Sequence, residues 1–143
     1  MRLTKFGHSC VRIEHEGTTV VLDPGAFTER EAVDGADLVL VTHLHPDHWT
    51  PEHLRRADAP VRTIAQVADA VGEQAPDLVE RLTVVAPGER FAAGGIDVEV
   101  GLVLTDATLL AGDPAAADLT GYGPLPADLA RDLLTPTDPQ DDP

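Results

Sequence analysis

The chain has 143 residues, 43% of them hydrophobic, which is enough for one domain with a hydrophobic core. Its formal net charge of −15 repels phosphate backbones, so we expect no nucleic-acid partner. Its single cysteine excludes an internal disulfide, and no apolar run reaches the roughly 18 residues of a membrane span. The first residues lack the apolar core of a signal peptide, so we expect a cytoplasmic protein without a membrane partner.

Short strands separated by turns are predicted over the first 41 residues. Apolar, alternating or β-branched runs predict strands at 3–6, 11–14, 18–22 and 38–41. His15-Glu16-Gly17 joins the second and third of these as a hairpin. Asp23-Pro24-Gly25 ends the third strand, and residues 28–36 are expected to form a short helix or turn.

Strands and short helices alternate after residue 50. Thr50-Pro51-Glu52 has the N-cap, proline and acid of a helix start, and that helix is expected to end near Ala57. Further strands are expected at 61–64, 82–85, 96–100 and 108–110, with Gly94-Gly95 turning a hairpin into 96–100 from a strand that begins at Phe91. Helical segments are expected at 66–71, stopped by Gly72, and at 76–81. This alternation predicts an α/β fold with a mixed sheet.

The character of the chain changes at about Pro114. Weak structure is expected at a set of alanine, glycine and proline residues, namely 115–117, Gly121, Gly123 and Pro124. We expect one domain over 1–125, followed at 126–143 by a short helix (126–134) and a disordered acidic tail rich in proline.

Histidines gather directly after the predicted strand 38–41. Thr42-His43-Leu44-His45-Pro46-Asp47-His48 holds three of the six histidines and one aspartate. Side chains alternate along an extended chain, so His43 and His45 are expected on one side, and a turn at Pro46 can return Asp47 and His48 to them. Imidazoles and carboxylates are ligands of zinc, manganese and iron, so the stretch predicts a metal site. The alternative is a polar loop that is merely rich in histidine.

The pattern His-x-His-x-Asp-His after a hydrophobic strand resembles the signature of the metallo-β-lactamase-fold hydrolases. The stretch from Leu3 to Cys10, the turn Leu22-Asp23-Pro24-Gly25 and Leu110-Ala111-Gly112-Asp113 are similar to the same family. More narrowly, they resemble its branch of metal-dependent hydrolases related to ascorbate-6-phosphate lactonase. The resemblance covers residues 1 to about 113. It implies a metallo-β-lactamase-like mixed sheet with short flanking helices, shortened relative to the full αββα sandwich.

The resemblance also implies roles for individual residues. His43 and His45 match ligands of a first metal, Asp47 and His48 ligands of a second, and Asp113 the carboxylate that bridges both. In the family, a water or hydroxide between the metals attacks a carbonyl or phosphoryl centre, and Asp47 would orient that water or accept its proton. Two further histidine ligands have no counterpart here. We therefore expect at most one tightly held metal, with zinc favoured over manganese or iron.

Three neighbouring residues have two interpretations each. His8 is expected to bind the metal or a metal ligand, or to be a turn histidine. Asp23 is expected to hold a ligand imidazole or only to form its turn, and Trp49 to line the pocket or pack beneath it.

Five other residues are expected outside the site. Cys10 is predicted in the core rather than as a nucleophile. His15 and His53 are predicted at the surface or at a helix cap, and Arg55-Arg56 on a solvated helix face.

Two functions remain open at this point. The first is a metal-dependent hydrolase of small ester, lactone or phosphoester substrates that uses a metal-activated water. The second is a degenerate member of the fold that binds metal without turnover, or that forms a homodimer to cover an apolar sheet face left bare by the shortening.

Overall fold

The computed structural model describes residues 1–101, 117–119 and 123–125. The chain forms two compact units, Met1–Val100 and Gly101–Pro143. The strand expected at 108–110 and the helix and tail expected at 126–143 lie outside the described residues. The domain limit expected at residue 125 stays a prediction.

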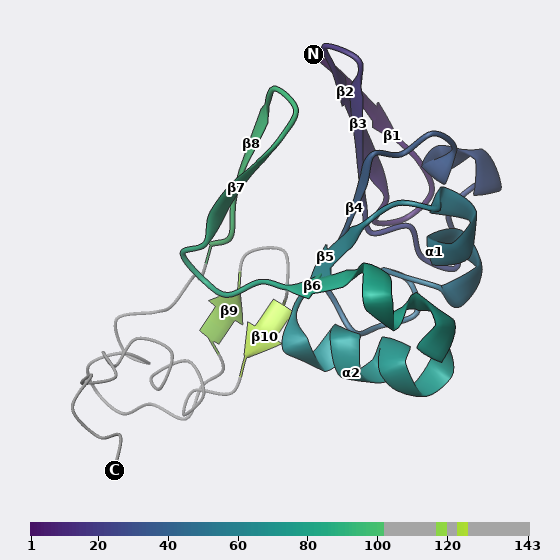
Figure 1. Ribbon diagram of the computed structural model, residues 1–143, viewed down its shortest axis with the longest axis vertical. Helices are drawn as coiled ribbons and strands as arrows, with labels where there is room; N and C mark the ends of the chain where they lie inside the picture. Colours follow the sequence, from purple (N-terminus) through teal and green to yellow (C-terminus); the bar gives the residue numbers. More distant parts are fainter. Residues whose placement is uncertain (102–116, 120–122, 126–143) are drawn as a thin grey trace. The chain divides into compact units, whose positions relative to one another are not determined.

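A six-stranded mixed sheet forms the centre of the first unit (Figure 1). The strands lie in chain order, with β1, β2 and β3 antiparallel and β3 to β6 parallel. They are β1 (Arg2–Lys5), β2 (Val11–His15), β3 (Thr18–Leu22), β4 (Leu38–Val41), β5 (Val61–Thr63) and β6 (Leu82–Val84). The prediction of a mixed α/β sheet from these six runs is confirmed.

Short helical segments connect the parallel strands. They are η1 (Arg30–Val33), α1 (Pro51–Ala57), α2 (Ala65–Gln74) and η2 (Pro76–Arg81). The predicted cap of α1 is present, since the Thr50 hydroxyl accepts a hydrogen bond from the His53 N–H at 3.2 Å.

The prediction that Gly72 ends the second helix is wrong, because α2 continues to Gln74. A helical glycine costs only about 1 kcal/mol relative to alanine. The fully buried Val67 and Val71 hold this helix in the core and outweigh that cost.

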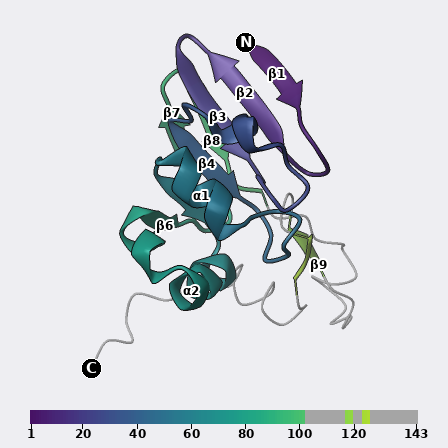
Figure 2. The same ribbon diagram turned by 90° about the vertical axis from the view of Figure 1, so that its right-hand side faces the viewer.

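The sheet separates two hydrophobic clusters, one on each face. The helices α1 and α2 lie over one of these faces (Figure 2). Successive residues of a strand face opposite sides, so Val21 and Val39 join the helices while Val20 and Leu38 face the other way. Coverage of both faces explains why β4 is apolar throughout and why β3 ends in three consecutive apolar residues.

A hairpin of β7 (Arg90–Ala93) and β8 (Ile96–Glu99) packs against the second cluster and contributes the buried Ile96 to it. The turn predicted at Gly94-Gly95 is confirmed: Gly94 has φ 57°, and a Cβ there would lie 2.0 Å from the Thr18 hydroxyl. Glycine is required because it allows both the left-handed backbone and the close approach to β3.

In the second unit, β9 (Ala117–Leu119) and β10 (Gly123–Leu125) form an antiparallel pair. The prediction of weak structure at Ala117, Gly123 and Pro124 is wrong. Pro124 lacks an N–H, but it is tolerated because, among the described residues, β10 pairs with β9 alone. Within the described ranges, no helix has the length and apolar character that crossing a membrane requires.

Candidate metal centre

The candidate site lies at the carboxyl ends of β3 and β4. Leu22, the last residue of β3, pairs with Leu40 of β4, so the loops that follow the two strands begin side by side. Asp23 follows β3, and Thr42 and His43 follow β4. In open α/β sheets this edge is where ligands bind.

The His45–His48 segment forms the predicted turn. The His48 N–H donates to the His45 carbonyl at 3.0 Å. Pro46 occupies the second position of this four-residue turn, where its fixed φ is favourable. The turn reverses the chain and returns His48 towards His43.

Three imidazoles of the motif are packed together. The His43 ring centroid lies 4.9 Å from that of His45 and 4.6 Å from that of His48, with interplanar angles of 29° in both pairs. Burial, together with the neighbouring His48 and His45 imidazoles, lowers the pKa of His43. His43 is therefore held in the neutral form that metals bind.

Asp23 contacts both Thr42 and His48. One Asp23 oxygen accepts from the Thr42 N–H at 2.8 Å and the other from the Thr42 hydroxyl at 2.6 Å. The second oxygen also lies 3.1 Å from His48 Nδ1. Burial raises the pKa of Asp23, while the hydrogen bonds from Thr42 and the nearby His48 oppose that rise. Because Nδ1 is engaged, His48 presents Nε2 as its free nitrogen, the arrangement found around metal-binding histidines.

Asp47 lies between His8 and His48. Its Oδ2 is 2.7 Å from His8 Nε2 and 3.6 Å from His48 Nε2. Burial would raise the pKa of Asp47, but other interactions, led by the His8 hydrogen bond, outweigh it and lower the pKa. Two atoms bound to one tetrahedral zinc at about 2.1 Å each lie roughly 3.4 Å apart. The spacing of Asp47 Oδ2 and His48 Nε2 fits one edge of such a site.

These two donors do not complete a site by themselves. Within residues 1–101, no three histidine, cysteine, aspartate or glutamate side chains are positioned together to hold a metal ion. Asp113, the predicted bridging ligand, lies outside the described residues. The ligand set His43, His45, Asp47, His48 and Asp113 therefore stays a prediction, although its donor types fit zinc.

Trp49 packs beneath the motif. It is 4% exposed, belongs to the cluster on the helical face, and its indole N–H donates to the Leu44 carbonyl at 3.0 Å. Of the two interpretations of this residue, the structure supports packing under the loop.

The residues expected outside the site lie mostly where they were predicted. Cys10 is fully buried, as expected. His53 is 8% exposed, so a surface position is wrong, although its ring does meet the cap residue Thr50. The solvated face predicted for Arg55-Arg56 is confirmed, since both side chains are exposed, and each guanidinium forms paired hydrogen bonds with an aspartate.

Sequence reasoning missed Thr42, Ser9 and Gly25. Thr42 donates twice to Asp23, and Ser9 donates to the backbone of Asp47. Gly25 lies against that same backbone. Each adjoins a motif residue, but these contacts join segments far apart in the chain, so spacing alone gives no signal for them.

Residues 2–117 match the protein family described as "Beta-lactamase superfamily domain". The chain belongs to the beta-lactamase superfamily. A UPF0173 metal-dependent hydrolase of Shouchella clausii is 34% identical over 92 residues, which cover 59% of this chain and 40% of that protein. The chain spans less than half the length of the relatives that it matches.

Two solved structures of superfamily proteins have a similar fold. Igni18, a metallo hydrolase of Ignicoccus hospitalis, has a TM-score of 0.55 and 23% identity, over 71% of this chain and 48% of that one. MEM-A1, a subclass B3 metallo-beta-lactamase from a soil metagenome library, has a TM-score of 0.54 and 18% identity, over 68% and 47%. The predicted metallo-β-lactamase-like fold is thereby confirmed.

Proposed function

We propose that this superfamily member is a metal-dependent hydrolase of small ester, lactone or phosphoester substrates, with zinc as the favoured metal. The observation that carries the proposal is the 3.6 Å separation of Asp47 Oδ2 and His48 Nε2 beside the stacked imidazoles of His43 and His45. Relatives named metal-dependent hydrolases support it.

Each residue of the site has a distinct task in this proposal. A bound divalent ion would supply a water of lowered pKa and polarise the scissile bond. Asp47 is held in its ionised form and orients that water or accepts its proton, while His8 fixes the Asp47 carboxylate through the 2.7 Å hydrogen bond. Asp23 keeps the His48 ring turned so that Nε2 faces the site.

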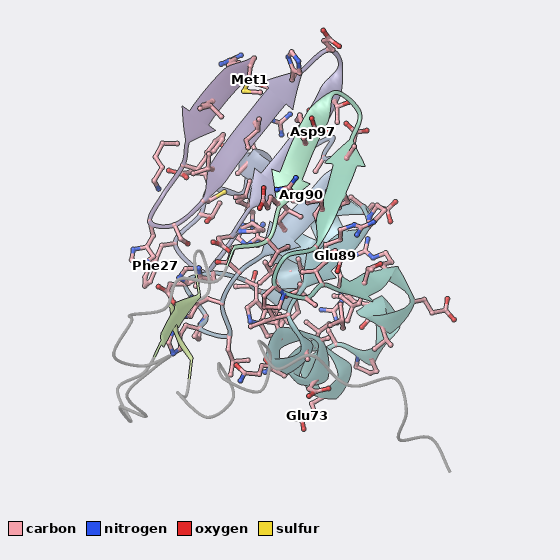
Figure 3. The ribbon with its side chains drawn as sticks, turned by 90° about the vertical axis from the view of Figure 1, so that its left-hand side faces the viewer. Met1, Phe27, Glu73, Glu89, Arg90 and Asp97 are labelled. Atoms are coloured by element: carbon pink, nitrogen blue, oxygen red, sulfur yellow. The ribbon has the colours of Figure 1, made fainter. Side chains whose placement is uncertain are left out.

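Apolar side chains near these donors favour a substrate with an apolar group. Phe27, labelled in Figure 3, is 68% exposed. Its ring centroid lies 5.6 Å from that of His8. Leu44, between two predicted ligands, is 44% exposed. An exposed aromatic ring beside the proton acceptor would contact the acyl or alcohol part of an ester.

The test is hydrolysis of nitrophenyl esters, lactones and a nitrophenyl phosphodiester, with and without added zinc. Asp47→Ala should lower zinc-dependent turnover by at least about 100-fold, the usual size of a lost acid–base group. Asp69→Ala, which changes an exposed aspartate of α2, serves as the control and should leave turnover unchanged. Equal turnover by the wild type and Asp47→Ala would overturn the mechanism.

The second candidate function is a non-catalytic, metal-binding or dimerising member of the fold. It is favoured by the incomplete donor set within residues 1–101 and by the short span relative to the relatives. This candidate predicts metal uptake without turnover on any substrate of the panel. In the dimerising version, the proposed partner is a second copy of this chain, and the protein would sediment at twice the monomer mass at micromolar concentration. A monomer at that concentration would contradict this version.

A further inference from the structure

Ser9 lies in a loop that the structure ties down on several sides. Phe6 N–H donates to the Cys10 carbonyl at 3.0 Å and closes the loop at its base. The Gly7 N–H donates to Glu29 at 2.8 Å, and His8 takes a left-handed backbone with φ 53°. These constraints fix the position of the Ser9 hydroxyl in the absence of a ligand. Little conformational entropy of this loop is therefore lost when a ligand binds.

The Ser9 hydroxyl donates to the carbonyl oxygen of Asp47 at 2.6 Å. It also lies 3.3 Å from the Asp23 carbonyl oxygen. A hydroxyl has only one proton to donate, and the shorter distance favours the Asp47 carbonyl as its acceptor. The accepting carbonyl belongs to the peptide that joins Asp47 to His48. The N–H of this same peptide donates to the His45 carbonyl at 3.0 Å, so both polar groups of the peptide are held.

The peptide before Asp47 is held as well. The Ala26 N–H donates to the Pro46 carbonyl at 2.8 Å. Gly25 lies so close that an added Cβ would be 1.9 Å from the Asp47 carbonyl oxygen. Both peptide planes that flank the Asp47 Cα are therefore fixed, and Ser9 is the side chain that fixes the second of them.

We infer that Ser9 is a positioning residue for the proposed metal site: by holding the Asp47–His48 peptide, its hydroxyl aims the side chains of both residues at one ion. The inference rests on the proposed function, because it assigns those two residues as ligands. Its physical reason is that rotation of this single peptide would move both side chains at once and widen the 3.6 Å separation between Oδ2 and Nε2.

The experiment measures Co²⁺ affinity by chelator competition, together with the d–d absorption of the bound ion, which reports ligand geometry. Ser9→Ala should weaken binding by about 10- to 100-fold, the usual effect of losing a residue that supports a ligand, and should alter the spectrum. Ser9→Thr, which keeps the hydroxyl, should restore both. Thr50→Ala removes a different structural hydroxyl, the cap of α1, and should leave affinity and spectrum unchanged.

The outcomes separate this inference from the proposed function. Wild-type affinity and spectrum in Ser9→Ala, or an equal loss in Thr50→Ala, would overturn the role of Ser9 and leave the hydrolase proposal standing. A wild-type protein that takes up no Co²⁺ would overturn both. Weakened binding in Ser9→Ala with recovery in Ser9→Thr is the result expected.

Discussion

Replacing Gly25 by alanine perturbs the contact between the loop after β3 and the turn that carries Asp47. The new Cβ would lie 1.9 Å from the Asp47 carbonyl oxygen, 2.0 Å from its carbonyl carbon and 2.5 Å from the His48 nitrogen. All three are backbone atoms, so no side-chain rotation relieves the overlap. Carbon atoms normally approach to about 3.5 Å, so the two loops must separate by more than about 1 Å. Overpacking lowers the free energy of unfolding by about 1–3 kcal/mol, and we expect a loss near the upper end of this range for Gly25→Ala.

Urea unfolding followed by the fluorescence of Trp49 measures this effect. With a slope of about 1–3 kcal/mol per M urea, a loss of about 3 kcal/mol lowers the midpoint by roughly 1–3 M. Gly72→Ala is the matched control, because a Cβ there would meet, among residues 1–101, only Val79 at 3.9 Å and the residue is helical. That variant should be stabilised by about 0.5–1 kcal/mol. A loss below about 0.5 kcal/mol in Gly25→Ala, or an equal loss in Gly72→Ala, would refute the reasoning.

Three further predictions test the core, the helix cap and the buried thiol. Leu54 is fully buried, so Leu54→Ala should cost about 2–5 kcal/mol in thermal unfolding, and a loss below about 1 kcal/mol would contradict its place in the core. Thr50→Ala should cost about 1 kcal/mol through the lost cap, whereas Thr50→Ser should cost little; equal losses would show that the hydroxyl is not the cause. Burial raises the pKa of Cys10 to about 11, so iodoacetamide should label it slowly at about pH 8 and rapidly in the unfolded chain; fast labelling of the folded protein would contradict this.

The strands of the first unit could be predicted because their patterns are local. Runs such as 18–22 and 38–41 are apolar and β-branched, and each is bounded by a turn residue. The end of α2 could not be predicted, because tertiary burial of Val67 and Val71 outweighs the local signal of Gly72. The burial of His53 depends likewise on the residues that pack over α1.

The candidate site could be predicted in part. The turn at Pro46 and the meeting of His43 with His45 follow from spacing within one short stretch. The contact from Ser9 to Asp47 joins residues 38 apart in the chain, and that from Asp23 to Thr42 residues 19 apart. Such contacts depend on which strands become neighbours in the sheet, which a single sequence does not specify residue by residue.

Zinc content tests the metal site most directly. The protein is purified without a histidine tag, loaded with zinc, desalted and measured by elemental mass spectrometry beside His48→Ala and His15→Ala. His15 lies at the end of β2 and serves as the control. We predict about one zinc per chain in the wild type and in His15→Ala, and a large loss in His48→Ala, because His48 Nε2 lies 3.6 Å from Asp47 Oδ2, close to the spacing of two ligands on one zinc. A wild type without zinc, or equal zinc in all three proteins, would contradict a metal site at this motif.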